Sequence, residues 1–179
     1  MHLEEKTLES EQKFDGIVVK LYVDQVELED GRNAVREVIK HPGGVCVVPV
    51  NDKGEVYMVK QFRYPFKEVC LELPAGKLEK GEDPFVAAQR ELKEETGCTG
   101  RDWVSMGNMY PTPGICSEID RLYFCHVDKE SDGLDLDEDE FIEPLRIPLE
   151  KAVEMAMNGE LPDAKTQLMV LKVARYLGT

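Results

Sequence analysis

The segment AGKLEKGEDPFVAAQRELKEETGC, residues 75–98, limits the fold most strongly, because it joins a glycine-containing loop to a helix with marked ends. Asp83 is a favourable N-cap residue, and Pro84 suits the first position of a helix. Gly97 suits the left-handed conformation that ends many helices. The segment therefore predicts a loop followed by a single helix between Asp83 and Gly97.

The predicted helix carries Glu91, Glu94 and Glu95 on one turn, where like charges repel one another. On a helical wheel these residues border the apolar face, whereas the charges of an ordinary surface helix lie opposite the core. Two explanations remain open from the residues alone. The segment is either a charged surface helix or a site for a hard cation such as Mg²⁺ or Mn²⁺, which carboxylate oxygens bind well.

The rest of the chain mixes strand and helix signals. The turn sequences EDGR and NDKG each separate two extended runs, which is typical of β-hairpins. Two helices are predicted near the C-terminus, at 149–158 and 163–177. Strands are predicted at 45–50, 55–62, 69–73, 103–110 and 121–127, with a further extended piece at FIEPLRIPL. Because these elements form no regular βαβ repeat, the sequence predicts an α+β fold.

The first part of the chain is predicted to form a separate unit. Its extended runs flank Asp30 and Gly31, a strong hairpin signal, and HPGG at residues 41–44 is a natural break. The expected organisation is therefore an N-terminal antiparallel β-hairpin unit at residues 1–40 and a larger domain at residues 41–179.

Composition argues against several kinds of partner and location. The net charge of −14 repels nucleic acid and anionic membranes, so neither is an expected partner. No apolar run approaches the roughly 20 residues of a membrane span, and the first residues lack the apolar stretch of a secretion signal. The five cysteines contain no CxxC pair and are typical of reduced core residues, which favours a cytoplasmic protein.

The helix segment is part of a longer pattern. Gly76 is followed after five residues by Glu82, and seven residues later RELKEETGC begins at Arg90. This resembles the Nudix box, in which a glycine and a glutamate precede Arg-Glu-hydrophobic-any-Glu-Glu-any-Gly-hydrophobic at the same spacings. The resemblance implies an αβα sandwich with a mixed sheet. It also implies Mg²⁺-dependent cleavage of a nucleoside diphosphate linked to another group.

The resemblance assigns roles by position. Glu91 and Glu95 are implied to be the principal metal ligands, with Glu94 close by and the carbonyl of Ala75 as a further ligand. The expected ion is Mg²⁺, for which Mn²⁺ can substitute. Structural roles are implied for the other fixed residues of the box, which are Gly76, Glu82, Arg90 and Gly97.

Segments outside the box resemble the ADP-ribose pyrophosphatase branch of the family. They are QFRYPFKEVCLELPAG, YPTPGICSE, LDEDEFIE and GELPDAKT, in this order along the chain. The implied reaction is hydrolysis of ADP-ribose to AMP and ribose 5-phosphate. The alternatives are a hydrolase of another nucleoside diphosphate sugar such as GDP-mannose, and a Nudix-like domain that senses nucleotides without cleaving them. The complete set of glutamates favours an enzyme.

Candidate substrate residues lie outside the box. A guanidinium fork can bind two phosphate oxygens, so Arg63 is the first candidate for contact with the diphosphate. Arg36, on the second run of the N-terminal hairpin, is a weaker candidate of the same kind. Glu118 is a candidate either for contact with the substrate or for ordering its loop.

The acidic loop LDEDEFIE corresponds to a catalytic loop of the resembled family. A carboxylate there can accept a proton from the attacking water, and a second can complete the metal shell. Glu138 is the favoured base and Glu140 the favoured ligand, although the reverse assignment and Asp139 stay open. Glu94 is the next candidate for the base.

The resemblance also implies an assembly. In the resembled branch, the N-terminal unit packs across a two-fold axis and helps to line the adenosine pocket of the partner. An isolated two-stranded ribbon is marginally stable in water, so a partner for this unit is physically reasonable. The expected assembly is a homodimer with two equivalent sites.

Overall fold

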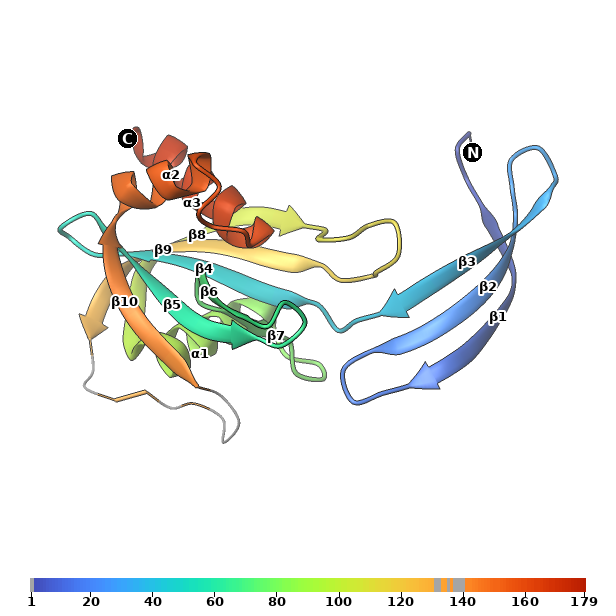
Figure 1. Ribbon diagram of the computed structural model, residues 1–179, viewed down its shortest axis with the longest axis horizontal. Coiled ribbons are helices and arrows are strands. Elements are labelled where there is room, and N and C mark those ends of the chain that lie inside the picture. Colours follow the sequence, from blue (N-terminus) through green and yellow to red (C-terminus); the bar gives the residue numbers. More distant parts are fainter. Residues whose placement is uncertain (1, 131–132, 135, 137–140) are drawn as a thin grey trace. The chain divides into compact units, whose positions relative to one another are not determined.

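The computed structural model describes residues 2–130, 133–134, 136 and 141–179. The chain forms two compact units (Figure 1). Unit 1 contains Met1–Gly43 and Tyr110–Ile119, and unit 2 contains Gly44–Met109 and Asp120–Thr179. From the sequence alone, residues 110–119 are not assigned to the N-terminal part, because they are far from it along the chain.

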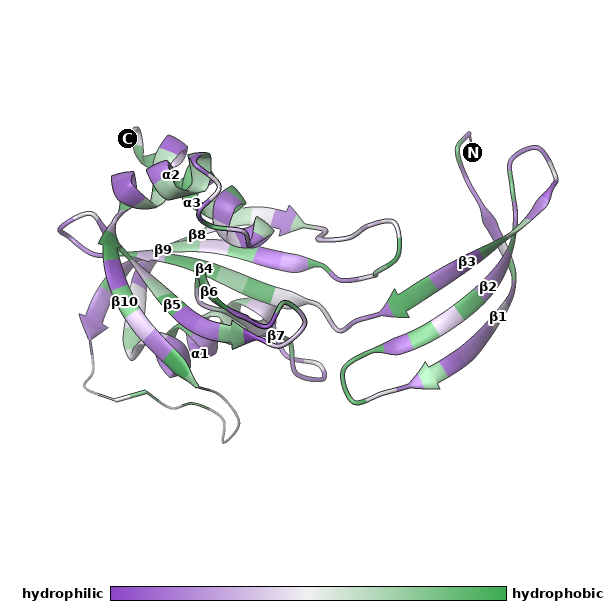
Figure 2. Cartoon of the chain, in the orientation of Figure 1, coloured by the Kyte–Doolittle hydropathy of each residue, from purple (hydrophilic) through white to green (hydrophobic). Residues whose placement is uncertain are grey.

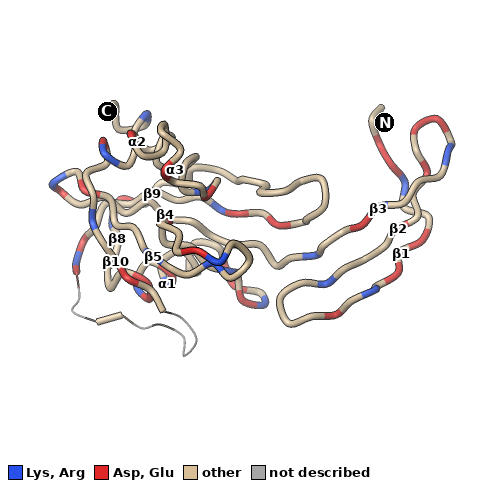
Figure 3. The backbone as a smooth tube through the Cα atoms, viewed as in Figure 1, with Lys and Arg blue, Asp and Glu red and all other residues tan. Residues whose placement is uncertain are grey.

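Unit 1 is built on an antiparallel sheet in the order β1 (Lys6–Asp15), β2 (Lys20–Glu27) and β3 (Asn33–Lys40). β2 and β3 are the predicted hairpin, and Gly31 has a φ of +82° in the turn, a value that glycine adopts without strain. β1 adds a strand to the predicted hairpin. Every residue of β1 is exposed, and charged residues recur along the strand, separated by uncharged ones (Figure 3). It therefore lacks the apolar alternation that identifies a strand in a sequence.

Residues 110–119 join unit 1 through backbone hydrogen bonds to the end of β3. The Ile39 N–H donates to the carbonyl of Ile115 at 2.7 Å, and the Ser117 N–H donates to the carbonyl of Ile39 at 2.9 Å. The His41 N–H donates to Ser117 Oγ at 3.0 Å. Since Glu118 lies in this segment, a candidate substrate residue belongs to the same unit as the N-terminal sheet.

Unit 2 contains a mixed sheet with helices. Its strands follow the order β10-β5-β4-β9-β8, with β6 paired to β5 and β7 paired to β4. β4 and β9 run parallel, and the other neighbouring strands run antiparallel. The strands are β4 (Gly44–Val50), β5 (Glu55–Arg63), β6 (Glu68–Glu72), β7 (Ala75–Lys77), β8 (Cys98–Met109), β9 (Asp120–Glu130) and β10 (Ile142–Pro148). The helices are α1 (Pro84–Thr96), α2 (Leu149–Met157) and α3 (Ala164–Leu177).

β4 explains why helices cover both faces of this sheet. It is buried along its whole length and is largely apolar (Figure 2). Val45 and Val47 pack in the core cluster that includes α1, whereas Cys46 and Val48 pack in the cluster that includes α2 and α3. Because alternate residues of a strand point to opposite faces, an apolar strand of this kind needs a cover on each side. The predicted α+β fold, an αβα sandwich with a mixed sheet, is confirmed.

Two strands of unit 2 differ from the sequence prediction. β8 begins at Cys98, directly after α1, although a strand is predicted only from residue 103. Register shifts interrupt β8, including one between Arg101 and Val104, so its apolar alternation is broken. β7 lies within the predicted loop, where Gly76 is opposite Val45 of β4. The loop before α1 is therefore attached to the central strand.

Two properties bear on the environment of the protein. In the part of the chain that the structure describes, no helix combines the length and the apolar character needed to cross a membrane. The five cysteines all lie in the described ranges and are all free thiols, and only Cys116 is not buried. Burial raises the pKa of the Cys125 thiol to about 12, which is typical of an unreactive core residue.

Candidate metal and diphosphate site

Local interactions fix both ends of α1. The carboxylate of Asp83 accepts hydrogen bonds from the N–H groups of Phe85 at 2.9 Å and Val86 at 3.2 Å. Gly97 ends the helix with a φ of +70°, and its N–H donates to the carbonyl of Lys93 at 2.8 Å. The helix ends predicted from Asp83 and Gly97 are confirmed. The fixed ends of α1 and the pairing of β7 with β4 hold the helix and the loop before it in place.

The glutamates of α1 differ in exposure. Glu91 is 8% exposed and Glu95 is 3% exposed, whereas Glu94 is only half-buried. Glu91 and Glu95 are four residues apart and therefore share one face of the helix. The fully buried side chains Ala87 and Leu92 lie beside this face. The two carboxylates that the sequence favours as metal ligands are thus the two that point inward.

Arg90 offsets the repulsion between the glutamates of α1. Its Nη1 group donates to Glu91 Oε1 and to Glu94 Oε2, both at 2.8 Å. One guanidinium nitrogen thus bridges two carboxylates that would otherwise repel each other. The hydrogen bond with Glu82, followed by the charge of Glu91, raises the pKa of Arg90, so the guanidinium stays charged.

Glu82 links the same arginine to the preceding loop. Arg90 Nε donates to Glu82 Oε1 at 2.9 Å, and Arg90 Nη2 donates to Glu82 Oε2 at 3.1 Å. The Glu79 N–H also donates to Glu82 Oε2 at 2.9 Å. The hydrogen bond from Arg90 lowers the pKa of Glu82. A charged pair therefore ties the loop to the helix, although the purely structural role assigned to both residues stays a prediction.

Ala75 connects β7 to the inner carboxylates. Its N–H donates to Glu95 Oε2 at 3.0 Å. A buried carboxylate needs a hydrogen-bond partner, and this contact supplies one while holding Glu95 beside the strand. The carbonyl of the same residue is the predicted backbone ligand of the metal, so a single residue orients one ligand and offers another.

Position 76 requires a glycine because the Glu91 carboxylate fills the space that a side chain would occupy. A Cβ atom at position 76 would overlap the Glu91 carboxylate, which lies directly against the glycine backbone. The absence of a side chain therefore creates the space for this carboxylate. This close approach gives a physical reason for the glycine that begins the sequence motif.

Replacing Gly76 with alanine is expected to displace the Glu91 carboxylate rather than to unfold the protein. The overlapping atoms are the end of a flexible side chain, which can move more easily than the backbone. Binding of Mn²⁺ alone, followed by electron paramagnetic resonance, should weaken by roughly 10- to 100-fold, as for other changes that misplace a ligand. Gly114→Ala is the control, since no atom would contact the added Cβ there. Unchanged Mn²⁺ affinity in Gly76→Ala would contradict this account.

The donor atoms fit a hard divalent cation. The buried carboxylates of Glu91 and Glu95, the half-buried Glu94 and the carbonyl of Ala75 are all oxygen donors, which Mg²⁺ and Mn²⁺ prefer. Within the described ranges, no three His, Cys, Asp or Glu side chains converge into a complete metal centre. Mg²⁺ ordinarily binds through one or two carboxylates plus water and substrate phosphate. The site therefore offers a partial set of ligands of the kind that Mg²⁺ uses.

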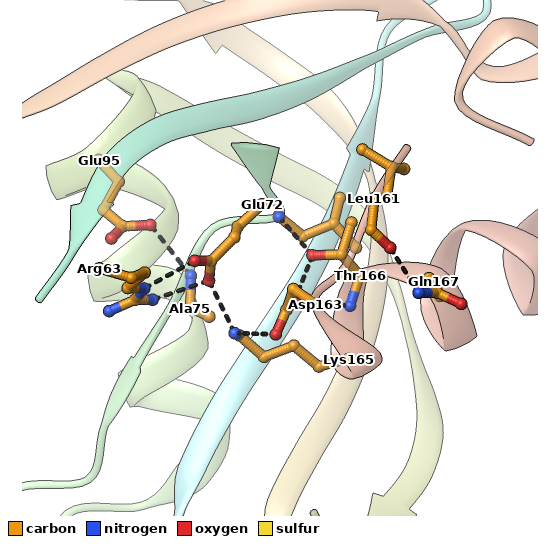
Figure 4. A network of polar contacts seen from close by, with 10 residues as sticks. Arg63, Glu72, Ala75, Glu95, Leu161, Asp163, Lys165, Thr166 and Gln167 are labelled. Carbon is orange, nitrogen blue, oxygen red and sulfur yellow. Dashed lines mark hydrogen bonds and ion pairs between the residues drawn. The ribbon is translucent and has the colours of Figure 1, made fainter. Parts of the chain in front are cut away.

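Arg63 lies at the end of β5, and its fork holds a carboxylate. Nε donates to Glu72 Oε1 at 2.6 Å, and Nη2 donates to Glu72 Oε2 at 2.7 Å (Figure 4). This hydrogen-bonded pair raises the pKa of Arg63. The side chain is 37% exposed, and Nη1 has no partner among the residues described. One edge of the guanidinium is therefore fixed by protein, and the other remains for a ligand.

The remaining candidates are spread over the chain. In unit 1, Arg36 forms a two-pronged ion pair with Glu5, and Glu118 Oε1 lies 3.4 Å from Nδ1 of His41. The favoured catalytic residues Glu138 and Glu140 lie outside the described residues. The structure thus brings Glu91, Glu94, Glu95, Ala75 and Gly76 together in unit 2, and the roles assigned to the others stay predictions.

Similarity to known proteins decides the family. The family model described as the NUDIX domain matches residues 40–167. The chain belongs to the Nudix family. Its loop, α1 and the glutamates of α1 are the Nudix box, and the protein is a Nudix hydrolase. Nudix hydrolases generally need a divalent metal ion, in agreement with the oxygen donors on α1.

Individual relatives extend over nearly the whole Nudix chain. The ADP-ribose pyrophosphatase of Bacillus subtilis (strain 168) is 46% identical over 165 residues, which cover 92% of this chain and 89% of that protein. The methanol dehydrogenase activator of Bacillus methanolicus is 42% identical over 170 residues, or 93% and 91% of the two chains. A solved structure titled as an ADP compounds hydrolase has a TM-score of 0.85. It covers 99% of this chain and 97% of that chain at 21% identity, which shows the shared fold.

Two residues near the Nudix box were missed in the sequence. Glu72 is 2% exposed and binds Arg63, and Lys165 of α3 binds Glu72 at 2.8 Å. A lone acid inside the apolar run VCLELP is a signal of a buried charge that needs a partner. One partner, Arg63, is nine positions away on the neighbouring strand, but Lys165 is 93 positions away along the chain, and no local pattern identifies it.

Proposed function

We propose that this Nudix hydrolase cleaves the diphosphate of ADP-ribose with water, giving AMP and ribose 5-phosphate. The observation that carries the reaction type is the inward-facing pair Glu91 and Glu95, which lies against Gly76 and Ala75. The substrate is supported by the relative from Bacillus subtilis, which is named as an ADP-ribose pyrophosphatase and matches 92% of this chain. The expected ion is Mg²⁺, with Mn²⁺ as a substitute.

Different residues of the site have different roles in this reaction. Glu91, Glu94, Glu95 and the Ala75 carbonyl would hold the ion, which supplies neutralisation of the diphosphate charge and activation of water. Arg63 binds a phosphate oxygen with the guanidinium edge that Glu72 leaves available. A water oxygen bonds to one phosphorus as the bond from that phosphorus to the bridging oxygen breaks. A carboxylate of the acidic loop accepts the proton of the water.

A hydrolysis panel tests this function. The purified protein is incubated with Mg²⁺ and with ADP-ribose, GDP-mannose or a simple nucleoside triphosphate, and products are identified by mass spectrometry. Conversion of ADP-ribose to AMP and ribose 5-phosphate, with the highest kcat/KM of the panel, is expected. If GDP-mannose were cleaved preferentially, the substrate would be a nucleoside diphosphate sugar other than ADP-ribose.

Failure to cleave any compound would favour a non-catalytic role. A nucleotide sensor would bind ADP-ribose in a calorimeter without turning it over. The name of the relative from Bacillus methanolicus suggests activation of a partner enzyme as a further candidate, based on 42% identity over 93% of this chain. The location of the protein in the cytoplasm, expected from its unpaired cysteines, stays a prediction.

The working assembly in this proposal is a homodimer. Among the described residues of unit 1, only Val26 and Gly43 are buried. The apolar side chains of Phe14 and Val35, in contrast, are 56% and 52% exposed. A small sheet that buries so little is marginally stable by itself, and exposed apolar groups on such a surface favour contact with another protein. A second copy of this chain is the partner that the family resemblance implies.

Light scattering at micromolar concentration is expected to give twice the chain mass of 20.3 kDa. Val35→Asp places a charge among the exposed apolar side chains and should shift the protein towards the monomer. Asn33→Asp adds the same charge at an exposed polar position of the same strand and should leave the dimer intact. A wild-type protein that is monomeric and fully active would refute the dimer.

A further inference from the structure

Lys165 places a positive charge in the interior of unit 2. It is the second residue of α3, and its side chain is 16% exposed. Its Nζ donates to Glu72 Oε2 and to Asp163 Oδ1, both at 2.8 Å (Figure 4). Burial lowers the pKa of Lys165, but the charges of Asp163 and Glu72 outweigh burial and raise it. The lysine is therefore a charged donor with two carboxylate partners.

Glu72 receives cations from two directions. The ammonium of Lys165 comes from α3, and the guanidinium of Arg63 comes from the end of β5. Burial raises the pKa of Glu72, but the hydrogen bonds and charges of Arg63 and Lys165 prevail, so the pKa falls below its usual value. The carboxylate is 2% exposed and charged, and its position depends on both donors. Any movement of Glu72 would be transmitted to Arg63 through their two hydrogen bonds.

Thr166, which is next to Lys165, also attaches the start of α3 to the residue that follows β6. The Leu73 N–H donates to Thr166 Oγ1 at 3.0 Å, and Thr166 Oγ1 donates to Asp163 Oδ2 at 2.6 Å. The Asp163 side chain also caps the helix by accepting from the Thr166 N–H at 2.9 Å. These bonds fix the start of α3 to the residue after β6. The ion pair between Lys165 and Glu72 is an addition to this attachment.

Stability alone gives a poor reason for such a buried ion pair. The cost of removing two charges from water commonly equals or exceeds the attraction between them, and apolar replacements are often as stable. What the pair supplies is orientation, since it fixes the oxygens of Glu72 against which the Arg63 fork is aligned. The Nη1 edge of the partly exposed Arg63 side chain is then presented in one orientation.

We propose that Lys165 is a positioning residue for diphosphate binding: by holding Glu72, it sets the orientation in which Arg63 binds a phosphate oxygen of the substrate. This role rests on the proposed function, because it takes a diphosphate compound as the ligand. Lys165 itself does not touch the substrate. The path of its influence runs from α3 to Glu72 and then to Arg63.

The test measures binding of α,β-methylene-ADP, whose diphosphate cannot be hydrolysed, by calorimetry in Mg²⁺. Lys165→Met removes the charge and keeps an apolar side chain of similar length. Its Kd should rise about 10-fold, since hydrogen bonds to charged groups contribute enough to account for this change. Lys165→Arg, which retains a cation, should recover at least part of the affinity.

Two controls separate positioning from stability and from charge. Thr166→Val removes the attachment of α3 and should lower the melting temperature, but its Kd should stay within about 2-fold of wild type. Lys172→Met removes a lysine from the same helix that contacts the carbonyl of Met106 on β8, and should also leave the Kd unchanged. A rise in Kd with Thr166→Val equal to that with Lys165→Met would show a general structural effect and overturn the role.

A double-mutant cycle tests the path through Glu72. In the Glu72→Gln background, Lys165→Met should change the Kd by less than about 2-fold, because the carboxylate that Lys165 holds is gone. A full 10-fold effect in that background would overturn the path. If Lys165→Met does not fold, Lys165→Gln replaces it, and failure of both to fold would show that the lysine is structural.

The outcomes also separate this role from the proposed function. The binding measurement needs no hydrolysis of ADP-ribose. A wild-type protein that binds α,β-methylene-ADP but does not cleave ADP-ribose would refute the function and leave the role of Lys165 intact. A wild-type protein that does not bind the analogue would overturn the role of Lys165, whatever the hydrolysis panel shows.

Discussion

Glu95→Gln is expected to lower kcat/KM for ADP-ribose by at least about 100-fold, because several kcal/mol of charge stabilisation depends on a correctly held metal ion. A neutral amide is a poor ligand for Mg²⁺. The Ala75 N–H donates to Glu95 Oε2 at 3.0 Å, and the amide oxygen of glutamine can accept the same hydrogen bond. The substitution therefore removes the charge while retaining the contact that holds the side chain.

The measurements for this variant are initial rates over a range of Mg²⁺ concentrations, binding of Mn²⁺ alone, and thermal melting. Activity and Mn²⁺ affinity should fall together, and the cooperative melting transition should remain. Glu150→Gln is the matched control, because Glu150 is an exposed glutamate in the first turn of α2. If Glu95→Gln retained activity within a fewfold of wild type, Glu95 would not be a principal metal ligand.

Glu138→Gln is expected to lower kcat for ADP-ribose by roughly 10²- to 10⁴-fold, the usual contribution of a general base. The prediction comes from the position of Glu138 in the acidic loop of the sequence, since this residue lies outside the described part of the structure. Glutamine has nearly the same shape as glutamate but cannot accept the proton of the attacking water. The Kd for α,β-methylene-ADP should stay close to that of wild type, because the base acts in the chemical step.

Neighbouring acids provide the comparison for this variant. Glu140→Gln should weaken binding of Mn²⁺ as well as activity if Glu140 is a metal ligand, whereas Glu138→Gln should affect kcat alone. The reversed pattern would exchange the two roles. If single Asn or Gln replacements at Asp137, Glu138, Asp139 and Glu140 all left kcat unchanged, the base would lie elsewhere, and Glu94 would be tested next.

The helix of the Nudix box could be predicted because its determinants are local. Asp83 caps N–H groups two and three residues later, and Gly97 closes the helix on the carbonyl of Lys93. Such interactions depend on only a few neighbouring residues, so the sequence pattern is sufficient to locate them. The same holds for the turn at Gly31, whose positive φ follows from the residue type.

Elements without a local signal could not be predicted. β1 is exposed at every position and has no apolar face, so its existence depends on pairing with β2. β7 is three residues long and becomes a strand because Gly76 lies opposite Val45 of β4. The hydrogen bonds that define β1 come from the next strand along the chain, and those that define β7 come from β4, which is separated from it by β5 and β6. In both cases the strand is defined by its pairing partner rather than by an apolar pattern of its own.

The side chains of the candidate site also include some that could be predicted from the sequence and some that could not. The spacing of Glu91 and Glu95 places both on one helix face, so the sequence by itself determined the family and which two carboxylates are the candidate metal ligands. Only the tertiary structure decided that the fork of Arg63 is held by Glu72, and that Lys165 holds Glu72 from α3. Spacing along a helix is fixed by backbone geometry, whereas the partner of a buried charge is fixed by whichever elements the folded core brings together.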